Sequence, residues 1–291
     1  MPEEKKEIYK SNYRHSFIHS CSLDKEDLKK LCKKLEEKLN ECVEIEVSEF
    51  RRPEKMTNEE FEKVKEAIKK NLKLSVQIIG KKGKQIIGQN FSVFDEVDFP
   101  EDLDLVVFSN SFPFKFFFGY EPRNIFEIRL RFFKDPILNL SNPREEPSDN
   151  SSVKVFGSNE SWVTATYHGI LSFFEDKKRN RSWLHKKHIY DLFLFLFILP
   201  ATFWIIFRID NYISLLNTNI STVLSIAIYF YIFFLILFFF RILFNYVKWV
   251  FPLVEFSTKE GTKMSKHRRF LWTLIVGIIG GLILDILRTL L

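Results

Sequence analysis

The sequence predicts an α+β cytosolic domain followed by an all-α transmembrane region of three helices. Charged residues are frequent up to about Lys187, whereas the rest of the chain is mostly Phe, Leu and Ile. Residues 229–240 read YFYIFFLILFFF, and the run from Ile220 to Phe244 contains a single charge, Arg241. A helix of about 25 residues crosses the roughly 30 Å hydrocarbon core of a bilayer. A helix that is apolar on every face is not typical of a soluble domain of this size.

Length, charge and cysteine content narrow the class of protein. The 291 residues suffice for one or two domains, and the part before the apolar segments is long enough to bury its own core. A net charge of +6 would suit nucleic acid, but the basic residues gather beside the apolar segments, where membrane topology explains them. Cys21, Cys32 and Cys42 lack metal-type spacing, so we expect reduced thiols. No apolar h-region opens the sequence, so the first span is expected to direct insertion.

Apolar periodicity and capping signals predict alternating helices and strands in the N-terminal part. Leu28, Leu31 and Leu35 recur at helical steps and form one stripe, and Thr57 with Glu60 forms a capping box. The predicted helices span residues 24–41, 57–72 and 161–178, and the predicted strands span residues 43–50, 74–79, 85–93, 103–108, 125–133 and 153–156. This mixture indicates an α+β domain.

Three connecting stretches have distinctive compositions. Residues 112–118 read FPFKFFF, which fits either a core strand or a loop that rests on the lipid interface or on a partner protomer. Lys82-Gly83 suits a hairpin turn between two predicted strands. Residues 139–152 are rich in Asn, Ser, Pro and acidic residues, which predicts a surface loop.

One predicted strand carries candidate ligand-binding residues. In residues 126–132 the even positions are apolar, whereas Glu127, Arg129 and Arg131 occupy the odd positions and face the other side. Two arginines on one face of a strand could bind an anionic ligand through bidentate contacts. The commoner meaning of this pattern is a solvated face of the sheet.

A second candidate ligand site lies between a predicted strand and the helix that follows it. Ser158 and Asn159 precede that helix, whose free backbone N–H groups could hold an anion or a phosphate. The alternative is an ordinary capped turn. Glu160 favours the alternative, because it already supplies negative charge to the helix dipole and would repel a phosphate.

Signals for catalysis or metal binding are weak. His15 and His19 lie four residues apart, which would put both on one face of a helix, but the spacing offers no third ligand. The sequence has no GxSxG, Walker A, HExxH or strand-linked GxGxxG motif. We therefore expect no catalytic residue, no metal site and no cofactor, and a membrane-bound enzyme is the least favoured function.

The distribution of basic residues predicts the topology of the membrane region. Six Lys and Arg residues lie between positions 177 and 187, and five lie between positions 259 and 269, so both segments are expected on the cytoplasmic side. The spans are predicted at about 189–209, 220–244 and 270–288, with a kink at Pro200 in the first. Residues 1–180 then form the cytosolic domain, 181–188 a basic juxtamembrane hinge, and 189–291 a transmembrane domain whose C-terminus lies outside.

The segments on either side of the second span are expected to lie at the two membrane surfaces. Residues 208–219 carry a single positive charge and are expected to form the outer loop. Residues 245–256 are semi-apolar and are expected to continue from the second span along the interface.

The third predicted span carries a repeated pattern of small and polar residues. Thr273, Gly277, Gly281 and Asp285 recur at steps of four, so they share one face of the helix. Small residues at this spacing let helix backbones approach closely, and an ionisable residue in a span usually turns toward protein or water. This face is either a subunit contact or pore, or a packing face within one protomer with Asp285 near the outer interface, where Arg288 is within reach.

A cytosolic domain joined by a basic hinge to C-terminal spans resembles the membrane effectors of bacterial anti-phage defence systems. The resemblance covers architecture alone and carries over no residue. It implies a homo-oligomer in the inner membrane, whose cytosolic domain senses a nucleotide, an oligonucleotide or a partner protein and whose spans then permeabilise the bilayer. The alternative is a non-conducting anchor or scaffold for the cytosolic domain.

Overall fold

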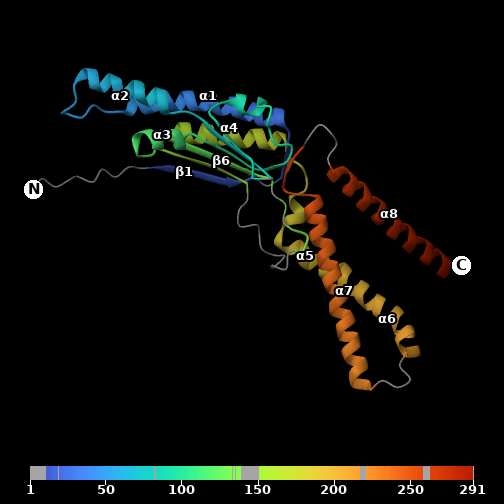
Figure 1. The fold of residues 1–291 in the computed structure, drawn as a ribbon. Helices are drawn as coiled ribbons and strands as arrows, with labels where there is room; N and C mark the ends of the chain where they lie inside the picture. Colours follow the sequence, from blue (N-terminus) through green and yellow to red (C-terminus); the bar gives the residue numbers. More distant parts are fainter. Residues whose placement is uncertain are drawn as a thin grey trace, which may run out of the picture. The chain divides into compact units, whose positions relative to one another are not determined.

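The computed structural model describes residues 11–18, 20–81, 83–132, 134, 136–138, 151–216, 221–257 and 263–290 (Figure 1). Contacts between residues divide the chain into two units. The N-terminal unit comprises Met1–Phe133, Asp149–Arg179 and Val254–Gly261, and the C-terminal unit comprises Lys134–Ser148, Asn180–Leu253 and Thr262–Leu291. The N-terminal unit therefore includes a short segment that follows the most apolar helix in the sequence.

The N-terminal unit is built on an antiparallel sheet, which has six strands in the part of the chain that the structure describes. Their order across the sheet is β1-β7-β6-β5-β3-β4, and each neighbouring pair is antiparallel. The strands are β1 (Asn12–Phe17), β3 (Ser75–Gly80), β4 (Gln85–Gly88), β5 (Leu103–Ser109), β6 (Ile125–Arg131) and β7 (Ser152–Gly157). The predicted α+β class is confirmed for this unit.

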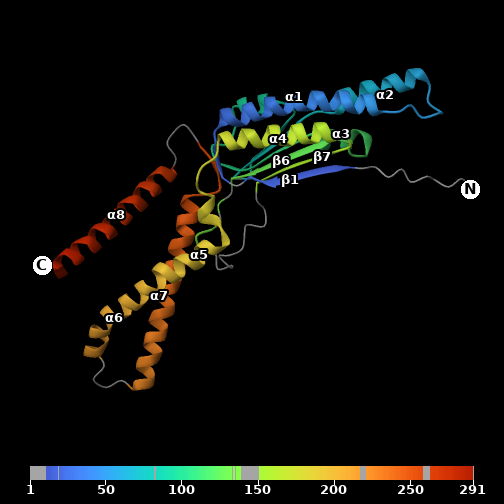
Figure 2. The same cartoon turned by 180° about the vertical axis from the view of Figure 1, so that it is seen from behind.

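Helices cover one face of this sheet (Figures 1 and 2). They are α1 (Lys25–Glu49), α2 (Asn58–Asn71), α3 (Ser111–Phe118) and α4 (Glu160–Asp176), with a short 3-10 helix, η1 (Phe91–Asp95). Ile78, Phe108 and Ile128 point from the strands into the core and are fully buried, as are Leu31 and Leu35 of α1. The apolar stripe predicted from the sequence is therefore the face of α1 that packs on the core.

Two predicted helix starts are confirmed by their caps. The Asp24 carboxylate accepts a hydrogen bond from the N–H of Asp27 at 2.7 Å, which opens α1. The Thr57 hydroxyl accepts one from the N–H of Glu60 at 3.3 Å, and the Glu60 carboxylate accepts one from the N–H of Thr57 at 2.9 Å. Each cap satisfies backbone donors that a helix leaves unpaired at its first turn.

The strand predicted over residues 43–50 is wrong, because α1 continues through it to Glu49. The β-branched residues Val43, Ile45 and Val47 favour a strand locally. Cys42 and Glu46, however, lie one helical turn apart and are both buried. Burial along a helical face therefore outweighs the local preference.

Other local predictions are wrong or incomplete. Residues 112–118 form neither a core strand nor a loop but α3, which buries Phe114, exposes Phe112 and Phe116, and ends at Gly119 with a φ of 77°. The strand predicted over 85–93 stops at Gly88, because η1 follows with its own cap. His15 lies on β1 rather than on a helix. His19, Lys82 and residues 139–150 lie outside the described residues.

The described secondary structure of the C-terminal unit is helical. The helices are η2 (Ser182–His185), α5 (Lys187–Phe193), a π-helical turn η3 (Leu194–Ile198), α6 (Leu199–Leu216), α7 (Thr222–Val250) and α8 (Lys263–Leu290). Among the described residues, two helical stretches, His188–Asp210 and Thr222–Val250, are long and apolar enough to cross a membrane by length and composition. The third predicted span, 270–288, lies within α8, where several side chains are outside the described residues, and it stays a prediction.

Between the first predicted span and β8, the structure differs in three details from what the sequence predicts. The π-helical turn η3 ends at Ile198, two residues before Pro200, which cannot donate a backbone hydrogen bond to the preceding turn. α6 continues to Leu216, so Arg208 and Asp210 lie on a helix and not in a loop. α7 runs to Val250, and the segment expected at the interface instead completes α7 and forms strand β8 (Val254–Phe256).

Candidate functional site

The sheet face opposite the helices carries the predicted arginines. Arg129 of β6 is exposed, and its Nε lies 2.8 Å from Oε1 of Glu127 on the same strand. The strand register places Lys154 of β7 opposite Glu127, and Val107 of β5 opposite Arg129. Arg131 shares this face because strand residues alternate sides. The structure thus brings together three basic side chains and one carboxylate on this face.

This arrangement is chemically suited to an anion. Guanidinium groups present several N–H donors in a plane, which matches phosphate and carboxylate oxygens. Val107 and the neighbouring Leu105 of β5 are only partly buried, so apolar surface lies beside Arg129 and Arg131 on the same face. An anion at this surface would have to compete with Glu127 for Arg129. Binding by Arg129 and Arg131 stays a prediction.

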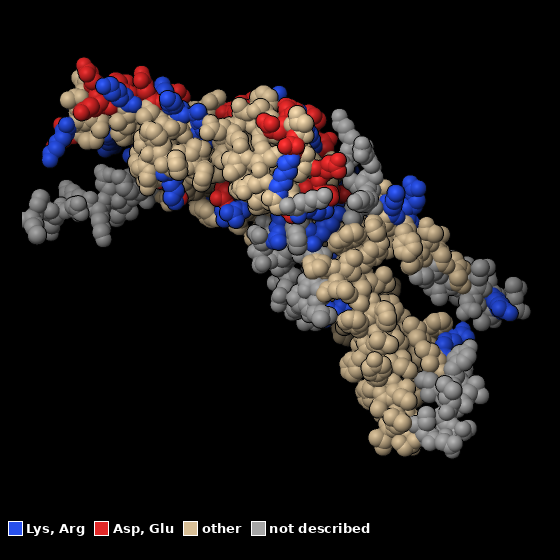
Figure 3. Space-filling model, in the orientation of Figure 1, with Lys and Arg blue, Asp and Glu red and all other residues tan. Residues whose placement is uncertain are grey.

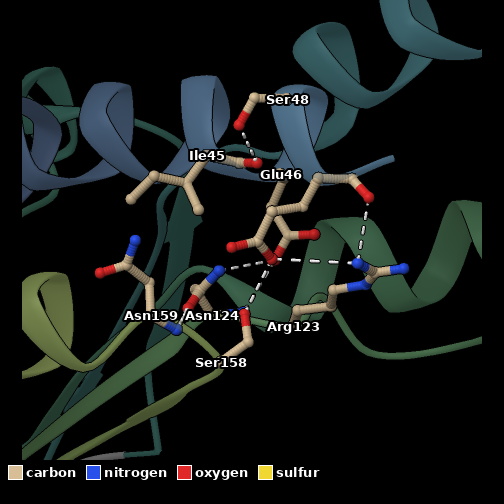
Figure 4. Close-up of polar contacts among 8 residues, drawn as sticks. Ile45, Glu46, Ser48, Arg123, Asn124, Ser158 and Asn159 are labelled. Atoms are coloured by element: carbon tan, nitrogen blue, oxygen red, sulfur yellow. Dashed lines mark hydrogen bonds and ion pairs between the residues drawn. The ribbon is translucent and has the colours of Figure 1, made fainter. Parts of the chain in front are cut away.

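Ser158 and Asn159 lie at the start of α4, as predicted, where both take part in a hydrogen-bonded cluster (Figure 4). The Asn159 side chain accepts a hydrogen bond from the N–H of Trp162 at 3.0 Å and caps α4. The Ser158 hydroxyl donates to Oε2 of Glu49, at the end of α1, at 2.9 Å. Nη1 of Arg123 lies 3.8 Å from the same carboxylate oxygen and donates to the Glu49 carbonyl oxygen at 3.2 Å.

A buried carboxyl group lies at the centre of this cluster. Oε1 of Glu46 accepts hydrogen bonds from the backbone N–H of Asn124 at 2.8 Å and from its side-chain amide at 3.3 Å. Burial raises the pKa of the Glu46 carboxyl, and the hydrogen bonds from Asn124 partly oppose that rise. A Cβ at Gly157 would lie 2.2 Å from Oδ1 of Asn124, so only glycine allows this close approach.

The cluster favours a structural role over the predicted anion site. Any anion near Ser158 would meet the carboxylates of Glu46 and Glu49, and like charges repel at this range. The polar groups of Ser158 and Asn159 are instead engaged with α1 and with Asn124. We therefore place the candidate ligand on the open face of the sheet, around Arg129 and Arg131.

A small second sheet joins the two places where the chain leaves and re-enters the N-terminal unit. Its two strands are β2 (Cys21–Leu23) and β8, and an isolated bridge places Lys178 beside Cys21. On one side of β2, the N–H of Ser22 donates to the carbonyl of Lys177 at 3.3 Å, and the N–H of Arg179 donates to that of Ser20 at 3.1 Å. The chain that leaves this unit after Arg179 is thus paired with β2.

The returning chain pairs with the other side of β2. β8 runs parallel to β2, and the N–H of Ser257 donates to the carbonyl of Leu23 at 2.8 Å. Because adjacent strands are about 4.8 Å apart, the leaving and returning chains lie about 10 Å from each other. We call residues 177–179, β2 and β8 the β2 clamp; it holds both ends of the segment that contains α5, α6 and α7.

An ion pair ties this clamp to α1. Nζ of Lys177 lies 2.8 Å from Oδ1 of Asp27, whose side chain is only 9% exposed. The hydrogen bond to Asp27 and its negative charge raise the pKa of Lys177. The first turn of α1 and the departing chain are therefore fixed to each other by a largely buried carboxylate.

Aromatic contacts connect β8 to the strand that carries the arginines. Phe132 directly follows β6, and its ring centroid lies 5.6 Å from that of Phe256 on β8. The ring of Phe99 lies 6.2 Å from Phe256. Val254 and Glu255 of β8 are buried as well. Because these rings are in contact, a displacement of the end of β6 would also displace Phe256 on β8.

Within the C-terminal unit, the segment after β6 lies against α7. Nζ of Lys134 lies over the ring of Trp249 at 5.2 Å, and the Asn245 side chain donates to the carbonyl of Ile137 at 3.3 Å. Near the other end of this helix, the hydroxyl of Tyr229 is hydrogen-bonded to the carboxylate of Asp210 on α6.

The predicted small-residue face lies on α8. The Thr273 hydroxyl donates to the Arg269 carbonyl at 3.0 Å within the helix. A Cβ at Gly277 or Gly281 would meet no atom within 4 Å, so in the described protomer nothing packs on these glycines. Asp285 belongs to the helix, but its side chain lies outside the described residues.

The described residues offer no metal site, and the chain has no match among known proteins. Among the described residues, no group of three His, Cys, Asp or Glu side chains could hold a metal ion. Comparisons with family models, curated proteins and solved structures gave no match to this chain. Sequence reasoning missed the β2 clamp, and the one local signal for it was the alternation of apolar and acidic residues in Val254-Glu255-Phe256.

Proposed function

We propose that this protein is a homo-oligomeric membrane effector or ion channel, whose N-terminal domain senses a ligand or partner and gates permeabilisation of the bilayer. It would act in the cell inner membrane with the domain in the cytosol. An anti-phage role, with a nucleotide or oligonucleotide signal, is the biological setting that the architecture favours.

The exposed apolar surface of the C-terminal unit supports insertion into lipid. None of the residues in the most apolar 18-residue window of α7 is buried inside the chain. Figure 3 shows the described part of α6 and α7 almost entirely in tan, with few charged side chains. A soluble protein rarely exposes contiguous apolar surface on this scale. Lipid would bury it without a protein partner.

The observation that carries the proposal is the position of β8. This strand directly follows α7 in the sequence and precedes α8, yet it belongs to the N-terminal unit and pairs with β2. A tether alone would need one connection between a domain and its spans. Here the domain also holds the link between two helices, so a change in the domain can act on both.

The mechanism follows from this connection. A ligand at Arg129 and Arg131 would favour one position of the end of β6, and Phe132 would pass that preference to Phe256. β8 is only three residues long, so few hydrogen bonds hold it on β2 and its displacement would break few of them. The ligand shifts the equilibrium only by its differential affinity for the two positions of β8.

The glycine face of α8 is where we place assembly. No atom of the described residues lies within 4 Å of a Cβ placed at Gly277 or Gly281, and small residues at this spacing suit close packing against a helix of another copy. Thr273 and Asp285 extend the same face and supply polar groups for a subunit contact or a conducting path.

Ion flux from liposomes that contain the full-length protein tests the proposal. We expect flux that depends on protein density and on a signal from a panel of cyclic di- and trinucleotides. Absence of flux with every member at every density would reject a conducting effector. Replacing α6, α7 and α8 by unrelated apolar helices separates the alternatives, because a passive anchor would keep its cellular function and an effector would lose it.

A further inference from the structure

The strand β1 forms one edge of the six-stranded sheet (Figures 1 and 2). Its inner side is paired with β7, and the N–H of Ile18 donates to the carbonyl of Ser151 at 2.8 Å. In an antiparallel pair, residues with inward-pointing backbone groups alternate with residues whose groups point away. The backbone N–H and C=O groups of Tyr13, His15 and Phe17 therefore point outward, where no described strand pairs with them.

Among the described residues, this edge has little of the usual protection against pairing with another strand; Arg14 is its one exposed Lys or Arg. Edge strands are commonly shortened, bulged or interrupted by Pro or Lys. β1 has six residues, pairs with β7 without a bulge, and contains neither Pro nor Lys. The opposite edge strand, β4, has only four residues and ends in Gly88. Tyr167 of α4 reaches the His15 carbonyl at 3.4 Å, which leaves that oxygen able to accept a second hydrogen bond.

The side chains of β1 are also self-complementary. Tyr13, His15 and Phe17 form a row of rings on the open face, with centroids 6.2 Å and 4.8 Å apart, and Tyr13 is 61% exposed. If a second β1 is placed antiparallel and centred on His15, Tyr13 lies opposite Phe17 of the other copy. Arg14, the one Lys or Arg side chain of β1, then lies opposite the neutral Ser16.

We propose that two copies of this chain associate through their β1 edges, antiparallel and centred on His15, so that the two sheets become continuous. The three outward-facing residues would form three hydrogen-bonded pairs across the two-fold axis, with two hydrogen bonds in each. Aromatic pairs flank the axis, the two His15 side chains meet on it, and no two Lys or Arg side chains oppose each other. This inference rests on the proposed homo-oligomer and assigns it an interface outside the membrane.

Cysteine cross-linking in the full-length protein tests the register. The three native cysteines are buried, and burial raises the pKa of each thiol, so we expect them to react far more slowly than exposed cysteines on β1. In a Tyr13→Cys, Phe17→Cys variant the two cysteines of one strand are about 13 Å apart, too far to join. Across the two-fold axis they would be about 5.5 Å apart, within reach of a disulfide.

We expect mild oxidation of this double variant in proteoliposomes to give a dimer on a non-reducing gel. Gln85→Cys on the opposite edge, β4, controls for random collision and should give none. Adding His15→Pro should abolish the dimer, because it removes an outward N–H, whereas the β1–β7 pairing is spared. His15→Ala keeps that N–H and should leave the dimer.

The outcomes separate this interface from the proposed function. No dimer, or equal dimer from Gln85→Cys, overturns the β1 interface; so does a dimer that His15→Pro leaves unchanged. Flux without cross-linking would keep the effector and remove this interface. Cross-linking without flux would keep the interface and remove the effector.

Discussion

The ring of Phe256 meets the ring of Phe132 nearly edge-on, with centroids 5.6 Å apart and planes at 69°. Phe132 follows the strand that carries Arg129 and Arg131, and Phe256 belongs to the strand between α7 and α8. This contact therefore links the end of the strand that carries the candidate ligand face directly to β8, within the N-terminal unit.

Phe256→Ala should uncouple the domain from the spans. Removing the ring loses its contacts with Phe132 and Phe99, at a cost of about 1–3 kcal/mol, because the ring is only partly buried. We expect signal-dependent flux to fall severely, while the domain stays folded and still binds the signal. Flux assays, thermal unfolding and binding on the same preparation would measure the three effects.

Phe256→Leu is the matched control for that substitution. Leu keeps apolar volume against Phe132 and should retain most of the flux. Phe112→Ala, on exposed surface of α3, should change neither stability nor flux. Wild-type flux from Phe256→Ala would show that β8 does not transmit the signal through this ring.

The sequence predicts most strands of the large sheet, because each combines an apolar run or alternation with turn residues at its ends. It fails where distant contacts decide the structure. Residues 43–50 have local strand preference, yet burial of Cys42 and Glu46 makes them helical. β2 and β8 are three residues each and exist by pairing across more than two hundred positions, which no local pattern encodes.

The candidate site, too, was predictable from local pattern only in part. Alternation correctly put Arg129 and Arg131 on one face of a strand. The partners of Ser158 could not be foreseen, because Glu49 comes from the end of a helix that local preference assigned to a strand. The buried Glu46 was likewise hidden within that misassigned stretch.

Lys177→Met should loosen the β2 clamp. It leaves the carboxylate of Asp27 in a mostly buried position without its cation, which should lower the free energy of unfolding by about 1–2 kcal/mol, since Lys177 itself is partly exposed. Adding Asp27→Asn removes the uncompensated charge and should restore most of the loss. Chemical unfolding of both variants measures these changes in the free energy of unfolding. If the double variant lost the sum of the two single losses, Lys177 and Asp27 would not be coupled.

Glu46→Gln should change how stability depends on pH. The folded-state pKa of Glu46 is raised by burial, so the folded protein binds this proton more tightly than the unfolded chain. Glu46 therefore lowers stability as pH rises from the unfolded pKa, about 4.3, through the folded pKa. The glutamine variant should gain stability relative to wild type over that window, by unfolding measurements from pH 4 to 8. A pH-independent difference would contradict the shift.

Gly281→Leu should weaken assembly without harming the protomer. A Cβ at Gly281 meets no atom of the described residues within 4 Å, so we expect folding to be unaffected, whereas close approach by another helix is blocked. Gly280→Leu is the matched control, since Gly280 is equally open but lies about 100° around the helix. Subunit number in detergent should fall for the first variant alone; equal behaviour would place assembly elsewhere.

The central claim is that movement of β8 on β2 controls the membrane pathway, and locking the two strands together tests it most directly. Ser22 and Glu255 are direct partners in the pairing, so a Ser22→Cys, Glu255→Cys variant can form a disulfide between them. We predict that oxidised protein in liposomes shows no flux in response to the cyclic-nucleotide panel and that reduction restores it. Equal flux from the fully cross-linked and the reduced protein would contradict the account.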